Sequence, residues 1–193
     1  VLNSFSVAGD RGRTAPEEQS RPIKQSDVLK PLAAGCPPGF FAAFGLPFLD
    51  DLPLAVSRAY IEHATFTGMT PAALAELLSL HGHRVEFVKG TQSTEARFRE
   101  ELAASMSSIG TARERRIVVA FSRKVLGLLG DGHFAPVAGA CDDLSHVLLL
   151  ESNSWRYPPR QWVELGRLWE ACCTSTGFGY SRGYLIVHGY EKR

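Results

Sequence analysis

Two short apolar segments separated by a polar turn constrain this chain more than any other feature. Residues 133–140 are mostly small and apolar, and residues 146–150 read His-Val-Leu-Leu-Leu, which is typical of a strand. Between them, residues 141–145 have the aspartate and serine content of a tight turn. The sequence therefore predicts an antiparallel hairpin.

The predicted hairpin brings His133 close to Glu151 in either of two registers. With the turn centred on Asp142, the two residues are direct cross-strand partners. With the turn centred one residue later, at Asp143, His133 faces Asn153 and the glutamate is its diagonal neighbour. Opposed Cβ atoms lie about 4.5–5.5 Å apart and diagonal ones about 7–8 Å, so an imidazole reaches a carboxylate in both registers.

An imidazole and a carboxylate in contact are two members of a nucleophilic triad. Glu151 can accept the proton of one ring nitrogen, which fixes the tautomer, leaves the other nitrogen as a base and stabilises the imidazolium. A histidine followed by an acid on the neighbouring strand is the order found in papain-like cysteine enzymes. The residues alone also allow a histidine and an acid that only stabilise the fold.

Four motifs around this pair carry a family resemblance. They are Gly-His-Phe-Ala-Pro at 132–136, Trp-Arg-Tyr-Pro-Pro at 155–159, Leu-Trp-Glu-Ala at 168–171 and Ser-Arg-Gly-Tyr at 181–184. Together they resemble the phytochelatin synthases, with no insertion or deletion between residues 133 and 183. Fainter similarity extends upstream through residues 118–124 and 68–74.

The resemblance implies roles for three residues. His133 corresponds to the catalytic histidine, and Glu151 to the acid that orients it, where the family has aspartate. Arg182 keeps one arginine position of the family and is expected to pair with a substrate carboxylate in a forked geometry. Ser154 stands where the family usually places another arginine. No metal site in the protein is implied.

The family's nucleophile is a cysteine, in a Cys-Gly pair, at the start of its first long helix. Residues 1–5 resemble the end of that helix, so the cysteine is expected just before residue 1 and the chain is expected to be an inactive fragment. Cys36 is a poor substitute, because the surrounding prolines and glycines exclude the helix that would lower a thiol pKa. The remaining cysteines are expected in a turn or in packing at a helix end: Cys141, Cys172 and Cys173.

By this resemblance the chain is expected to be a glutathione γ-glutamylcysteinyltransferase that acts in heavy-metal detoxification. It would transfer a γ-Glu-Cys unit from glutathione to a second glutathione or a phytochelatin, through a cysteine acyl-enzyme. No organic cofactor is implied, and cadmium or zinc ions are expected as activators bound by glutathione thiolates. Two alternatives stay open: a hydrolase of the same fold, and a non-catalytic relative that binds thiol peptides or a partner.

Composition fits one ordinary globular domain over residues 1–193. With 45% hydrophobic and 21% charged residues, the chain has enough apolar material for a single core. A net charge of +1 and the short basic cluster at 113–116 argue against a nucleic-acid partner. No uninterrupted apolar run is long enough to predict a membrane span, and the sparse cysteines favour a cytoplasmic location. A homodimer is left open.

The expected architecture is α+β and papain-like, with N-terminal helices packed on a C-terminal antiparallel sheet. Helices are predicted from Thr70 to Gly82, after a cap at Ser93 or Thr94, and over residues 161–173. Strands are predicted at 84–88, 117–121, 133–140, 146–150 and 184–188. Residues 6–30 lack periodicity and are expected to form a mobile insertion.

Overall fold

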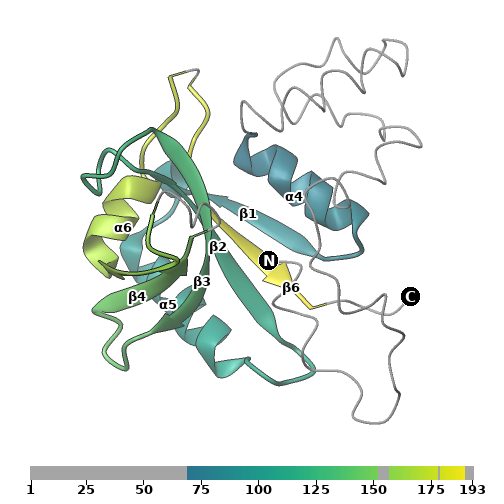
Figure 1. The fold of residues 1–193 in the computed structure, drawn as a ribbon. Coiled ribbons are helices and arrows are strands. Elements are labelled where there is room, and N and C mark those ends of the chain that lie inside the picture. Colours follow the sequence, from purple (N-terminus) through teal and green to yellow (C-terminus); the bar gives the residue numbers. More distant parts are fainter. Residues whose placement is uncertain (1–68, 152–156, 178, 190–193) are drawn as a thin grey trace, which may run out of the picture. The chain divides into compact units, whose positions relative to one another are not determined.

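The computed structural model describes residues 69–151, 157–177 and 179–189 of the chain. It divides into two compact units, Val1–His83 with Tyr190–Arg193, and Arg84–Gly189. The sheet and the candidate site belong to the second unit (Figure 1). That residues 1–193 act as one domain stays a prediction, and the expected insertion at 6–30 lies outside the described residues.

Helix α4, Pro71–Leu80, is the described part of the first unit, and its two ends follow from the sequence. The Thr70 hydroxyl caps it by accepting a hydrogen bond from the amide of Ala73 at 3.2 Å. Proline is tolerated in the first turn, where its missing amide proton would have no helical partner. After the helix, Gly82 has a φ of 82°, a left-handed conformation that glycine adopts without strain. The predicted N-terminal cap at Thr70 and the predicted end of the helix at Gly82 are both confirmed.

The second unit contains a six-stranded sheet in which every neighbouring pair is antiparallel. Its strand order is β1-β6-β2-β3-β4-β5 (Figure 1). The strands are β1 Val85–Lys89, β2 Arg115–Ser122, β3 Gly132–Ala140, β4 His146–Leu150, β5 Arg160–Glu164 and β6 Gly183–His188. A 3-10 turn, η5 Gly90–Gln92, and helix α5, Glu95–Ser107, follow β1, and helix α6, Leu165–Cys172, follows β5. The coarse prediction of an α+β protein with an antiparallel sheet is confirmed.

Helices α5 and α6 share one hydrophobic core with alternate residues of the strands. Since side chains alternate between the faces of a strand, every second residue of β2, β3, β4 and β6 reaches this core. The Phe98 ring of α5 stacks on Trp169 of α6 with 5.5 Å between ring centroids, which joins the two helices. Thr94 caps α5 by accepting from the Arg97 amide at 3.2 Å, so one of its two predicted caps is confirmed.

The prediction of a helix over residues 161–173 is wrong in its first part. Residues Arg160–Glu164 form β5, and the helix begins only at Leu165. In β5 the side chains alternate between exposed and half-buried, and Trp162 pairs with Leu148 of β4. The sequence Arg-Gln-Trp-Val-Glu has no clear helical or strand periodicity, and pairing with the edge of β4 makes it a strand.

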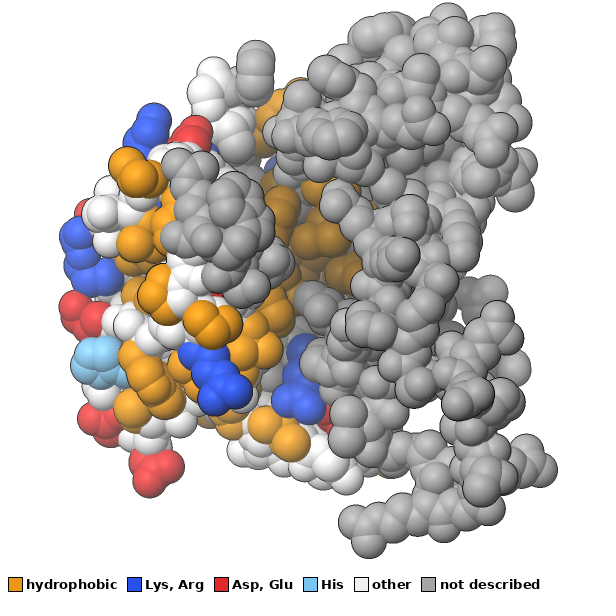
Figure 2. All heavy atoms as spheres, viewed as in Figure 1, with side chains coloured by type: hydrophobic (Ala, Val, Ile, Leu, Met, Phe, Trp, Pro, Cys, Tyr) orange, Lys and Arg blue, Asp and Glu red, His pale blue; other side chains and the backbone are white. Residues whose placement is uncertain are grey.

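The described surface has mixed charge. Acidic and basic side chains are interspersed on the face of the described residues that Figure 2 shows, in keeping with a net charge of +1. Among the described helices, none has the length and apolar character needed to cross a lipid bilayer.

Candidate active site

The candidate site lies where the ends of several strands meet. In an antiparallel sheet the end of one strand lies beside the start of its neighbour, so the ends of β2 and β4 adjoin the starts of β3 and β5. Main-chain hydrogen bonds extend both ladders past the strands, from Arg123 N to Asp131 O at 2.7 Å and from Glu151 N to Pro159 O at 3.0 Å. The residues that flank these strands are therefore held in fixed positions.

His133 and Glu151 are in direct contact at this end of the sheet. The His133 Nε2 and Glu151 Oε1 atoms are 2.7 Å apart, and the two side chains are 14% and 7% exposed. The His133 ring also meets the Phe121 ring edge to face, with 5.7 Å between centroids and an interplanar angle of 83°. The predicted contact between imidazole and carboxylate is confirmed, and its catalytic role stays a prediction.

The strand register shows which of the two predicted pairings holds. Val137 pairs with Leu149, and a bulge follows before Gly139 pairs with Leu148. Continuing the first of these registers by two residues puts Glu151 opposite Ala135, hence diagonal to His133. This corresponds to the later of the two predicted turn positions. The long glutamate side chain spans the diagonal.

Arg123 forms a second contact with the carboxylate, and sequence reasoning missed it. Its Nη2 lies 3.4 Å from Oε2 and 3.5 Å from Oε1 of Glu151. The guanidinium carbon lies 4.5 Å from the ring centroid of Tyr157, whose hydroxyl donates to the Leu129 carbonyl at 2.7 Å. A pairing of the predicted strands at 117–121 and 133–140 could have placed Arg123 near the histidine loop.

The environment of His133 favours its neutral form. Burial lowers the pKa of the imidazole below its ordinary value of 6.5, the charge and hydrogen bond of Glu151 oppose this, and Arg123 lowers it further. A neutral ring that donates from Nε2 to Glu151 has its lone pair on Nδ1. Within the part of the chain that the structure describes, Nδ1 has no hydrogen-bond partner. The arrangement is thus suited to accept a proton at Nδ1.

Arg182 lies just before β6 at the same end of the sheet, and its side chain is engaged inside the protein. It is 4% exposed, and its Nη1 donates to Thr174 Oγ1 at 2.9 Å and to the Ser175 carbonyl at 2.6 Å. Its Nη2 donates to Asp131 Oδ1 at 3.0 Å. These contacts anchor the loop that leads to His133. Binding of a substrate carboxylate by Arg182 stays a prediction.

Two of the described cysteines, Cys172 and Cys173, lie in environments that disfavour a thiolate. Cys172 is fully buried in the core, which raises the pKa of its thiol well above the ordinary range. Burial, and secondarily the charge of Glu95, raise the pKa of Cys173, whose thiol donates to the Gly90 carbonyl at 3.5 Å. Packing of Cys172 at a helix end is as predicted. Cys141 is half-buried and, like the other two, is a free thiol.

Cys36, Asn153 and Ser154 lie outside the described residues. Among the residues that are described, no three or more His, Cys, Asp or Glu side chains are grouped so that they could hold a metal ion.

The geometry defines a histidine–carboxylate pair at the end of an antiparallel sheet. Sequence comparisons place the chain in a family. The model of the family described as Phytochelatin synthase matches residues 47–184, well over half of the chain. The chain belongs to the phytochelatin synthase family.

Curated relatives agree with this assignment. Glutathione gamma-glutamylcysteinyltransferase 3 of Lotus japonicus is 33% identical over 133 residues, which cover 68% of this chain and 27% of that protein. Glutathione gamma-glutamylcysteinyltransferase of Schizosaccharomyces pombe is 33% identical over 89 residues, with coverages of 46% and 21%. Glutathione gamma-glutamylcysteinyltransferase 1 of Triticum aestivum is 30% identical over 121 residues, which cover 62% of this chain and 23% of that protein. The chain thus spans about a quarter of the length of these relatives.

Proposed function

We propose that this chain supplies the histidine and acid of a papain-like cysteine acyltransferase that uses glutathione. The observation that carries the proposal is the 2.7 Å contact between His133 Nε2 and Glu151 Oε1, which leaves Nδ1 for a thiol. The names of the relatives support glutathione as the donor of a γ-glutamylcysteinyl group. A papain-like fold is supported by the antiparallel sheet with a histidine strand followed by the acid.

In the first half-reaction a cysteine thiol gives its proton to Nδ1 of His133, and the thiolate attacks the carbonyl carbon of the Cys–Gly bond in glutathione. Glu151 stabilises the imidazolium that forms. The imidazolium then protonates the glycine nitrogen, the peptide bond breaks, and glycine leaves. A γ-glutamylcysteinyl thioester on the enzyme results.

In the second half-reaction the amino group of another glutathione attacks the thioester. His133 accepts the amine proton, the carbon–sulfur bond breaks, and a peptide longer by one γ-Glu-Cys unit is released. Cadmium or zinc is proposed to enter with this acceptor, as a thiolate complex of glutathione. These ions are part of the substrate in this scheme. Free glutathione is abundant where thiols stay reduced, so we propose a cytoplasmic setting.

The test is an acyl-transfer assay on the full-length gene product. Incubation with glutathione and cadmium should yield peptides extended by γ-Glu-Cys, detected by mass spectrometry. His133→Asn should lower the rate by about 10²-fold or more, because no general acid or base remains. Glu151→Gln should also lower the rate, because a neutral amide cannot stabilise the imidazolium.

The matched control is His146→Asn, which changes an exposed histidine at the start of β4. It should leave the rate unchanged. Release of γ-glutamylcysteine without any extended peptide would instead identify a hydrolase. No consumption of glutathione by the full-length gene product would contradict both enzymatic functions.

A further inference from the structure

Arg123 is a buried cation next to the histidine–carboxylate pair. The residue is 9% exposed, and the Glu151 carboxylate lies beside it. A buried guanidinium is costly unless a negative charge and hydrogen bonds compensate it. Glu151 therefore lies beside two groups that can be cationic among the described residues, the imidazole of His133 when it is protonated and the guanidinium of Arg123.

The distances show what kind of contact this is. Both carboxylate oxygens lie at 3.4–3.5 Å from the same Nη2 atom, longer than the 2.7 Å contact to His133. Good N–H···O hydrogen bonds are about 2.7–3.2 Å long, so the guanidinium acts mainly through its charge. The short hydrogen bond of Glu151 is left for the histidine.

The Arg123 side chain is held at both ends. Its head lies over the Tyr157 ring at 4.5 Å, a cation–π distance, and the Tyr157 hydroxyl is tied to the Leu129 carbonyl. Its backbone amide donates to Asp131, and its carbonyl accepts from the amides of Leu126 and Leu128 at 3.0 and 2.9 Å. The charge therefore has a fixed place relative to the carboxylate.

We propose that Arg123 is a positioning residue that, held on the ring of Tyr157, fixes the Glu151 carboxylate on Nε2 of His133 and directs Nδ1 towards the nucleophile. The placement follows from the described contacts alone. Its catalytic consequence rests on the proposed function.

This placement also sets the charge balance at the imidazole. Among the described residues, the charged groups that act on His133 are Glu151 and Arg123, with opposite signs. Arg182, just before β6, pairs with Asp131 of the loop before His133. Removing the charge of Arg123 should therefore take away the cation that opposes the effect of Glu151 on the pKa of His133.

The test is the pKa of His133, followed by NMR of the imidazole ring in the 193-residue chain. Arg123→Met should raise the pKa of His133 by about 0.5 or more, because a nearby cation is lost. Tyr157→Leu should also raise the pKa of His133, since the Arg123 guanidinium loses the aromatic ring that holds it in place. Tyr157→Phe keeps the ring and should leave the pKa almost unchanged.

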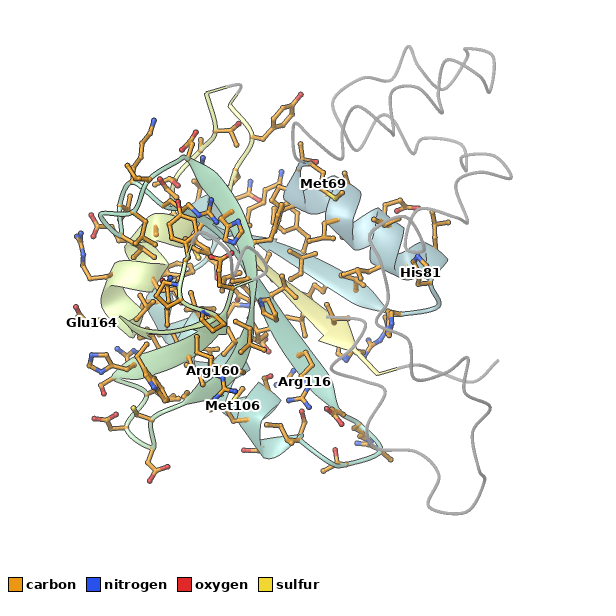
Figure 3. The ribbon with its side chains drawn as sticks, viewed as in Figure 1. Met69, His81, Met106, Arg116, Arg160 and Glu164 are labelled. Carbon is orange, nitrogen blue, oxygen red and sulfur yellow. The ribbon has the colours of Figure 1, made fainter. Side chains whose placement is uncertain are left out.

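The matched control is Arg116→Met. Arg116, labelled in Figure 3, belongs to strand β2, is paired with Glu114 and is largely buried. It lies near the start of that strand, whereas Arg123 directly follows its end, seven residues later. A purely structural effect of losing a buried arginine would appear in both variants. The proposal requires the pKa of His133 to respond to Arg123→Met alone.

An unchanged pKa of His133 in folded Arg123→Met overturns the proposal. If that variant does not fold, Tyr157→Leu against Tyr157→Phe decides the question, and equal pKa values in these two overturn it. The NMR comparison does not depend on acyl transfer. A wild-type protein that fails in the transfer assay therefore contradicts the proposed function and leaves the result for Arg123 standing.

Discussion

At the scale of single residues, Arg182 shows how much of the site depends on one buried side chain. Its guanidinium joins the loop that carries Asp131 to Thr174 and Ser175, which come from the segment after α6. Its carbonyl also accepts a hydrogen bond from the Gly90 amide at 2.8 Å. The residue connects three segments that are distant in sequence.

We expect Arg182→Met to lower the free energy of unfolding by about 2–3 kcal/mol, because three hydrogen bonds of a buried cation are lost together. Asp131→Asn should cost less than about 1 kcal/mol, since the Asp131 side chain is 53% exposed and its ion pair is partly solvated. Urea-induced unfolding measures both. Equal decreases in the free energy of unfolding of the two variants would show that the buried hydrogen bonds of Arg182 contribute no more than its ion pair with Asp131.

The contact of His133 with Glu151 could be predicted because it depends on one hairpin, in which strand alternation and turn length are local properties. The roles of Arg123 and Tyr157 could not be predicted in the same way. Their contact joins the end of β2 to the segment before β5 and depends on the order of strands in the sheet. Residue types alone do not encode that order.

At the scale of elements, the start of β6 is restricted by close backbone packing. A Cβ on Gly183 would lie 2.1 Å from the Val88 carbonyl oxygen and 2.6 Å from the Gly90 nitrogen. These backbone atoms belong to β1 and the turn after it, and neither can move without breaking the ladder between β1 and β6. Only glycine fits at this crossing.

Gly183→Ala should therefore destabilise the protein by at least about 2 kcal/mol, as expected for a side chain forced into a packed backbone contact. The matched control is Gly139→Ala in β3, where a Cβ would have no atom within 4 Å. Its effect should stay below about 0.5–1 kcal/mol. Thermal unfolding of the two variants provides the comparison, and similar melting temperatures would contradict the packing argument.

The wrong prediction of a helix at β5 has the same cause as the missed contact of Arg123 with Tyr157, because both depend on how the strands pair. The segment before α6 has no strong local preference, and pairing with β4 determines its conformation. Elements with local signals, such as the Thr70 cap of α4 and the strand β4 itself, agree with the prediction.

At the scale of the whole molecule, the pairing of distant segments decides the sheet. All five predicted strands are present, and β5 is the one that was not predicted. The order β1-β6-β2-β3-β4-β5 was not predictable, because β1 and β6 are about a hundred residues apart in sequence. Family resemblance supplied the site residues and the expected chemistry. It did not reveal the hydrogen bonds of Arg182 or the cation–π contact between Arg123 and Tyr157.

The stability of the molecule should depend on pH through His133. Its pKa in the folded chain lies below the ordinary 6.5, so the unfolded chain binds a proton first as the pH falls. The corresponding stability is present above about pH 6.5 and is lost as the pH falls through the folded pKa. Urea unfolding between about pH 7 and 5 should show a smaller loss in His133→Asn than in the wild type. Parallel curves would show that His133 does not contribute.

The position of β6 between β1 and β2 has a consequence for synthesis on the ribosome. The hairpin of β3 and β4, with its histidine and acid, is translated before the strand that joins β1 to the rest of the sheet. Arg182, which anchors the histidine loop, is also translated after both members of the pair. A nascent chain that pauses before residue 182 therefore carries the two reactive groups without their support, and final tightening of the site must wait for the last strand.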